Sequence, residues 1–184
     1  HALLPQTQSP AELMTQMNQV LLDDPPMEDT FASLLLMRWE PEKHLITYTN
    51  AGHCHPILIT SEGTNIIENS DLVIGLNRSV RYQEQTIELP AGSALLSYTD
   101  GLIEQRMKTG EMLGEEGLAR LLPPLLQGSD PIPALLEAIL RESESPDFTD
   151  DILVFWLERE RASAPPVRGP RWFSPFLDAS EARS

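Results

Sequence analysis

Two apolar segments with aspartates at opposite ends constrain the fold of this chain more than any other feature. The run Ala94–Tyr98 is typical of a buried strand, and the Thr-Asp-Gly turn that carries Asp100 follows it. In the second segment the order is reversed, because Asp150 and Asp151 precede the apolar run that begins at Ile152. If the two strands are antiparallel neighbours, the end of one meets the start of the other at one sheet edge. The sequence therefore predicts that the three carboxylates converge.

Such a carboxylate cluster, with no Lys or Arg to balance it, is costly unless a cation lies among its members. Hard divalent ions such as magnesium or manganese prefer this oxygen-rich setting. The alternative for Asp100 is a purely structural one. Asp-Gly after a strand is a common helix start, and a helix-compatible segment follows, so Asp100 could simply cap that helix.

The charge and cysteine content exclude several classes of protein. The 184 residues carry a net charge of −15, which argues against a nucleic-acid groove or an anionic membrane surface. No apolar run approaches the length of a membrane span, so we expect no membrane insertion. The single cysteine, Cys54, excludes an intrachain disulfide and fits a reducing compartment, which predicts a cytoplasmic location.

The order of predicted elements indicates an α+β domain. A capping box at Ser9–Glu12 begins a helix that ends near the acidic Asp-Asp-Pro-Pro turn. In the segment 31–39, apolar residues occupy both the odd and the even positions, which predicts a strand covered on both faces. The other strands are expected at 45–49, 57–59, 66–68, 85–89, 94–98 and 152–157, and the later helices at 114–126 and 131–142. Because most strand connections are short, we expect helices against mostly antiparallel sheets.

The last part of the chain differs in composition. From residue 159 onward the sequence is rich in Pro and Arg, which is typical of a flexible tail. The sequence therefore predicts a folded domain over residues 1–158 and a tail over 159–184.

The loop Asn50–Pro56 is the other candidate site. Its His-Cys-His segment could hold zinc, but zinc usually takes ligands from a second, separated cluster. The favoured interpretation is a structural loop in which Asn50, Gly52 and His53 form a turn tied down by side-chain bonds.

Four stretches, in order, resemble the SpoIIE-like bacterial branch of the metal-dependent (PPM-type) protein serine/threonine phosphatases. Phe31–Leu35 resembles the first strand after the family's long helix, and Asn50–Pro56 is similar to its Asn-Ala-Gly-His-Pro-Pro segment. The Tyr-Thr-Asp-Gly around Asp100 resembles a third motif. Asp150-Asp151-Ile152-Leu153 resembles the closing Asp-Asp-x-Thr, with Leu153 where Thr is usual. The resemblance covers about residues 9 to 158.

This resemblance implies a sandwich of two antiparallel sheets flanked by helices, with two Mn²⁺ or Mg²⁺ ions at one edge. It implies that Asp100 and Asp150 are metal ligands and that Asp151 lies beside the ligand, although the sequence leaves open an exchange of roles between Asp150 and Asp151. Gly101 is the backbone adjacent to the metal. In the implied mechanism, a metal-bound water attacks the phosphorus of phosphoserine or phosphothreonine. No side chain is assigned a catalytic role besides holding the metal ions. The implied substrate is a phosphorylated regulatory protein in bacterial signalling, such as an anti-sigma-factor antagonist. The sequence does not decide whether the chain forms a homodimer.

The chain departs from the family pattern near its start. The family carries Gly-Asp motifs on strands upstream of the long helix, and residues 1–30 contain no match to them. The chain therefore resembles the C-terminal two-thirds of such a domain, without its first strands. A catalytically inactive, phosphatase-like interaction module is the alternative function.

Overall fold

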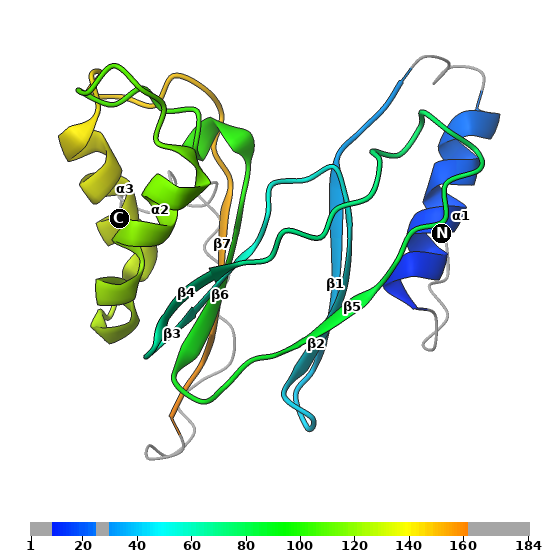
Figure 1. Ribbon diagram of the computed structural model, residues 1–184, viewed down its shortest axis with the longest axis horizontal. Helices are drawn as coiled ribbons and strands as arrows, with labels where there is room; N and C mark the ends of the chain where they lie inside the picture. The colour runs from blue at the N-terminus through cyan, green and yellow to red at the C-terminus, as the bar shows by residue number, and fades with distance from the viewer. Residues whose placement is uncertain (1–8, 25–29, 162–184) are drawn as a thin grey trace, which may run out of the picture.

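The computed structural model describes residues 9–24 and 30–161 and shows an α+β sandwich. Two antiparallel sheets face each other, with α1 outside one sheet and α2 and α3 outside the other (Figure 1). This architecture confirms the predicted fold class. The predicted tail lies almost entirely outside the described residues, and β7 ends at Arg159. In the described part of the chain, no helix is both long and apolar enough to cross a membrane.

Helix α1, Pro10–Asp23, begins as the sequence predicts. The Ser9 hydroxyl accepts a hydrogen bond from the Glu12 N–H at 3.1 Å, and the Glu12 carboxylate accepts one from the Ser9 N–H at 3.3 Å. This reciprocal capping satisfies two backbone donors that the first turn leaves free. Met14 is fully buried against the sheet beside Ala51, so the helix is anchored by its apolar face.

The sheet under α1 has the strand order β1-β2-β5 and contains β1 (Leu34–Glu40), β2 (Leu45–Ala51) and β5 (Gln85–Glu88). Both faces of β1 meet apolar residues, as predicted, because Leu34 and Leu36 pack against the cluster that contains Met14, whereas Leu35, Met37 and Trp39 pack against the cluster between the sheets. The cover is partial, since the residues of β1 are half-buried or exposed. Phe31, expected inside the strand, lies before it with 61% exposure.

The second sheet has the order β4-β3-β6-β7, with every pair antiparallel. Its strands are β3 (Ile57–Thr60), β4 (Gly63–Ile66), β6 (Ser93–Tyr98) and β7 (Val154–Arg159). Tyr98 pairs with Val154, which confirms that the strands flanked by the aspartates are antiparallel neighbours. Strand β4 begins earlier than predicted because the turn needs only two residues before Gly63, whose φ is +137°.

The first two helical segments after β6 are shorter than the sequence indicated, whereas the third has the predicted length. A single 3-10 turn, η2 (Asp100–Leu102), replaces the expected helix after the strand. Helix α2 covers Gly114–Leu121, and a 3-10 segment, η3 (Pro123–Gln127), follows because two consecutive prolines cannot continue the backbone bonding. Helix α3 (Pro131–Glu142) matches its prediction.

Strand β6 is the centre of the core. All six of its residues are buried, with Leu96 and Tyr98 packed toward α2 and α3 and Leu95 packed toward the other sheet. A strand that is covered on both faces has little freedom to move. The end of β6 therefore holds the Thr-Asp-Gly turn on a rigid support.

Candidate functional site

The fold brings the Asp100 turn and the Asp150-Asp151 segment into direct contact. A Cβ placed on Gly101 would lie 2.7 Å from the Asp151 carbonyl oxygen and 3.2 Å from the Asp150 Cβ. Only a residue without a side chain allows this approach. Gly101 therefore sets how closely the two aspartate-bearing loops can lie.

Thr99 joins the same two loops by hydrogen bonds. Its N–H donates to the Leu153 carbonyl at 3.1 Å, and its hydroxyl accepts from the Leu153 N–H at 2.9 Å. The hydroxyl also lies 3.4 Å from the Asp151 carbonyl oxygen, to which it donates. These bonds extend the β6–β7 pairing beyond Tyr98, although β7 as a regular strand begins two residues later than predicted. The sequence indicated Thr99 only as part of a turn and did not predict that it links the two loops.

The local bonding of Asp100 does not support the capping alternative. The 3-10 turn has Thr99 at its N-cap and no side-chain capping bond. The Asp100 carboxylate accepts from the Gly101 N–H at 3.0 Å, and the Asp150 carboxylate accepts from the Asp151 N–H at 2.7 Å. Each of the two aspartates keeps its second oxygen free of side-chain and backbone donors within the described residues.

These carboxylates have a donor set that fits a hard divalent cation. Asp100, Asp150 and Asp151 are exposed, and no Lys or Arg of residues 9–24 and 30–161 forms an ion pair with them. Magnesium and manganese are bound through a few carboxylate oxygens plus water. Within the same described ranges, no three His, Cys, Asp or Glu side chains form a metal-binding group. The structure thus presents a partial ligand set.

The Asn50–Pro56 loop is a tightly bonded turn beside this edge. The buried Asn50 amide donates to the His53 carbonyl at 3.0 Å and accepts from the His53 N–H at 2.8 Å. Gly52 has a φ of +71°, and a Cβ there would lie 2.2 Å from the Val73 side chain. These are the bonds and the backbone conformation that the structural-loop interpretation requires.

His55 is engaged by a carboxylate that sequence reasoning did not single out. Glu115, in the first turn of α2, accepts from the His55 N–H at 3.2 Å and lies 3.0 Å from His55 Nδ1. Since the two residues are 60 positions apart, no local pattern signals the contact. In the described part of the chain, this contact does not extend to a group of three His, Cys, Asp or Glu side chains that could hold a metal ion.

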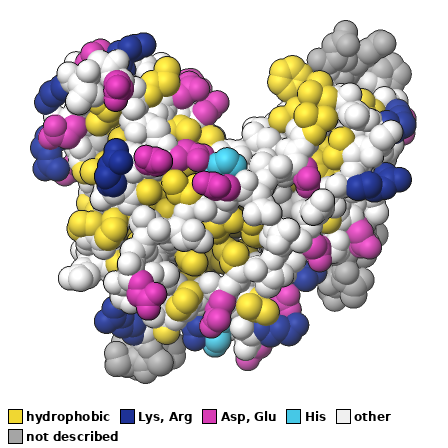
Figure 2. Space-filling model, viewed as in Figure 1, with side chains coloured by type: hydrophobic (Ala, Val, Ile, Leu, Met, Phe, Trp, Pro, Cys, Tyr) yellow, Lys and Arg dark blue, Asp and Glu magenta, His cyan; other side chains and the backbone are white. Residues whose placement is uncertain are grey.

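The loop and the carboxylate edge share one electrostatic environment. Burial, together with the negative charges of Asp100 and Glu115, raises the pKa of the Cys54 thiol to about 11. Figure 2 shows a notch between the two halves of the molecule, with a His side chain among acidic side chains on its floor. Asp100, Asp150 and Asp151 are each exposed, so the acidic edge is accessible from solvent.

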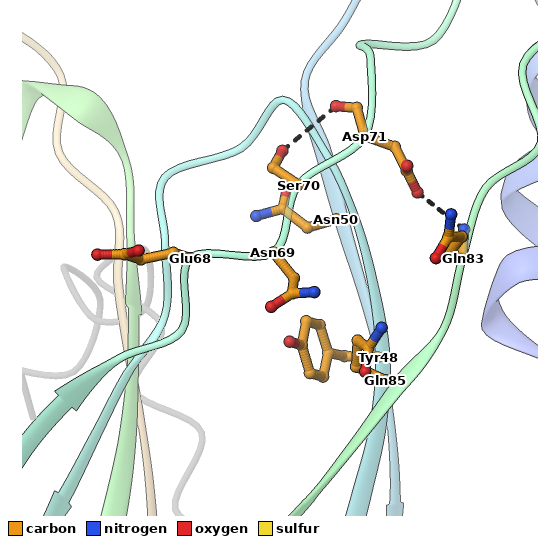
Figure 3. Close-up of a pocket in the computed structure, with 8 residues that line it drawn as sticks. All are labelled: Tyr48, Asn50, Glu68, Asn69, Ser70, Asp71, Gln83 and Gln85. Atoms are coloured by element: carbon orange, nitrogen blue, oxygen red, sulfur yellow. Dashed lines mark hydrogen bonds between the residues drawn. The ribbon is translucent and has the colours of Figure 1, made fainter.

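A polar cavity of about 470 Å³ is lined by residues of β2, β5 and the segment between β4 and β5. Figure 3 shows Glu68 at one end of its lining and Gln83 at the other, with Tyr48, Asn69 and Gln85 between them. Asn50 also lines it, so the cavity and the acidic edge are joined through the Asn50–Pro56 loop. The lining contains no Lys or Arg.

A protein-family model described as Stage II sporulation protein E (SpoIIE) matches residues 1–160. The chain belongs to the SpoIIE family. It is thus a relative of the PPM-type phosphatases, which confirms the resemblance. A comparison with curated proteins gives no match.

Solved structures with the same fold include members of this phosphatase group. The SiaA-PP2C domain of Pseudomonas aeruginosa is 16% identical with a TM-score of 0.69, and the match covers 84% of this chain and 61% of that one. A Mycobacterium tuberculosis protein with RsbU and RsbW domains is 25% identical with a TM-score of 0.69, with coverages of 88% and 44%. The phosphatase domain of SpoIIE from Bacillus subtilis, presoaked with Mn, is 15% identical with a TM-score of 0.59, with coverages of 91% and 71%.

The SpoIIE-family chain thus spans less than two thirds of the first two structures that it matches. The likeness below 25% identity concerns the fold, which these structures share with the sandwich seen in Figure 1. The position of Asp100 against Asp150 is a property of this chain's own geometry.

Proposed function

We propose that this chain is part of a metal-dependent protein serine/threonine phosphatase that acts on a phosphorylated regulatory protein in bacterial signalling. The observation that carries the proposal is the contact of the Asp100 and Asp150 loops across Gly101, with no basic side chain of the described residues paired to either carboxylate. The family membership and the Mn-presoaked relative support the same conclusion.

In this proposal Asp100 and Asp150 hold Mn²⁺ or Mg²⁺, while Gly101 and Thr99 fix the distance between their loops. A divalent ion at such a site lowers the pKa of bound water and neutralises charge on a phosphoryl group. The chain's own contribution is to hold Asp100 at the end of β6 and Asp150 before β7, and to leave both carboxylates open to a protein substrate. A phosphorylated anti-sigma-factor antagonist is the kind of substrate we propose.

The test compares this chain with a longer one that includes the upstream Gly-Asp segment of the parent protein. We expect weak manganese binding and little hydrolysis of a phosphoserine peptide by residues 1–184, because two aspartates leave most coordination positions to water. The longer chain should hydrolyse the peptide in the presence of manganese, and Asp100→Asn should abolish this activity. Glu137→Gln, an exposed substitution on α3, is the matched control.

A second candidate function is a catalytically inactive module that keeps the fold and binds the regulator. The absence of any group of three metal-binding side chains among residues 9–24 and 30–161 favours it. A longer chain that binds the regulatory partner but hydrolyses no phosphoserine would support this candidate. Manganese-dependent turnover by residues 1–184 alone would contradict our account of the partial ligand set.

A further inference from the structure

The polar cavity beside the Asn50–Pro56 loop has a composition that selects its ligand. Its lining combines two carboxylates with carboxamides and hydroxyls and contains no cationic side chain, as the following residues show: Tyr48, Asn50, Glu68, Ser70, Asp71 and Gln83. The two carboxylates repel a phosphate group, and no cationic side chain of the lining offsets that repulsion. A ligand with N–H donors and positive charge would find acceptors along the whole cavity.

Several of these polar groups have no partner of their own. Within the described residues, no hydrogen bond engages the side chains of Glu68, Asn69 or Gln85. Asn69 and Glu68 are exposed, and Gln85 is half-buried on β5. Carboxamides carry both donors and acceptors, so they can bond the main chain of an extended peptide in either direction.

Other lining groups are already fixed and form the rigid wall. Asn50 makes both bonds of the turn to His53, and the Asp71 carboxylate accepts from the Gln83 N–H at 2.8 Å. Tyr48 is buried, and burial raises the pKa of its phenol, which keeps it a neutral hydroxyl. The cavity is therefore preformed, with free carboxamides in its middle and Glu68 at one end (Figure 3).

We propose that this cavity binds an extended, basic segment of the phosphoprotein on which the acidic edge acts. The carboxamides of Asn69 and Gln85 bond the main chain of the segment, and Glu68 pairs with an arginine or lysine side chain. This inference rests on the proposed function and adds a sequence preference to it. The phosphoryl group of the substrate lies at Asp100 and Asp150. The cavity, across the Asn50–Pro56 loop, binds the substrate residues next to the phosphoserine.

The probe is a fluorescein-labelled phosphoserine peptide with two arginines on one side, compared with a peptide that has glutamines in their place. Binding to the full chain is measured by fluorescence anisotropy in EDTA, where no metal-dependent turnover occurs. The arginine peptide should bind more tightly. Glu68→Gln should weaken its binding about two- to fivefold, as expected for an accessible ion pair.

Two further variants separate a built site from the general attraction of an acidic protein. Glu137→Gln removes the same charge from α3, away from the cavity, and should leave the arginine preference unchanged. Asn69→Ala removes a carboxamide that is proposed to bond the main chain, so it should weaken the binding of both peptides and leave the arginine preference unchanged. Because Glu68 and Asn69 are exposed, neither substitution removes a core contact.

Equal binding of the two peptides would overturn the proposal, and so would equal effects of Glu68→Gln and Glu137→Gln. The result is independent of catalysis. An arginine preference that depends on Glu68, in a protein that never hydrolyses phosphoserine in its longer form, would retain the cavity assignment and refute the phosphatase assignment. Hydrolysis of phosphoserine without any arginine preference would retain the phosphatase assignment and refute the cavity assignment.

Discussion

The central strands of the two sheets differ from the edge strands in how completely they are covered. Strand β6 is buried along its full length, and β2 is buried at every residue except Leu45. The edge strands β1 and β7 are half-buried or exposed, and Leu153 and Phe155 are among the exposed apolar residues. Asp100 follows β6 and the polar cavity lies against β2, so a buried central strand supports each of the two proposed sites.

The largest expected effect tests this difference in packing. Leu96→Ala should lower the free energy of unfolding by about 2–5 kcal/mol, because the side chain is fully buried and its removal leaves a cavity. Leu36→Ala on the half-buried strand β1 should cost about half as much or less. Urea unfolding followed by circular dichroism measures both values. Equal costs would contradict the contrast between the central strand β6 and the edge strand β1.

The next effect concerns the contact that joins the two aspartate loops. Gly101→Ala places a Cβ 2.7 Å from the Asp151 carbonyl oxygen, so the loops must move apart. We expect a loss of about 1–3 kcal/mol in unfolding free energy and weaker manganese binding by the longer chain. Gly128→Ala is the control, because its Cβ would meet the Leu125 carbonyl oxygen at an ordinary 3.5 Å. Unchanged metal affinity in Gly101→Ala would show that the loop spacing does not matter.

A smaller effect is expected at the hydrogen bonds that extend the β6–β7 pairing. Thr99→Val keeps the shape of the side chain but removes the acceptor for the Leu153 N–H. The expected cost is about 1–2 kcal/mol, measured by urea unfolding. Thr86→Val on β5 is the matched control, because this threonine is exposed and its hydroxyl makes no bond within the described residues. Similar costs at both positions would remove Thr99 from the account of the site.

The smallest effect on stability, but a clear chemical one, is expected at Cys54. Burial and nearby carboxylates raise the pKa of its thiol from 9.0 to about 11, so the reactive thiolate is scarce at pH 8. Iodoacetamide should alkylate the native chain up to about a hundredfold more slowly than the urea-unfolded chain at that pH. The native rate should keep rising until the pH passes about 11.

The sign of the accompanying stability change follows from the same shift. The folded state holds the thiol proton of Cys54 more tightly than the unfolded state does. The contribution of this proton to the free energy of unfolding is therefore fully present below pH 9 and is lost as the pH rises to about 11. Equal alkylation rates for folded and unfolded chains would show that Cys54 does not share the acidic environment of Asp100.

Much of the fold was predictable because it depends on local patterns. The capping box of α1, the turn positions and the apolar runs of β2, β3, β5 and β6 depend on residues close in sequence. The antiparallel pairing of β6 and β7 also followed, because aspartates at opposite strand ends are meaningful only in that arrangement. The predicted start of β1 at Phe31 was wrong, because an apolar residue does not reveal where strand pairing begins.

The sequence by itself determined the element order, the antiparallel class and the positions of Asp100 and Asp150 at strand ends. Only the tertiary structure decided that Gly101 contacts the Asp150 loop, that Glu115 holds His55, and that Glu68 and Gln85 share a cavity. The physical reason is separation along the chain. A pattern reports the period and turn chemistry of nearby residues, whereas these contacts join segments that meet only after both sheets have packed.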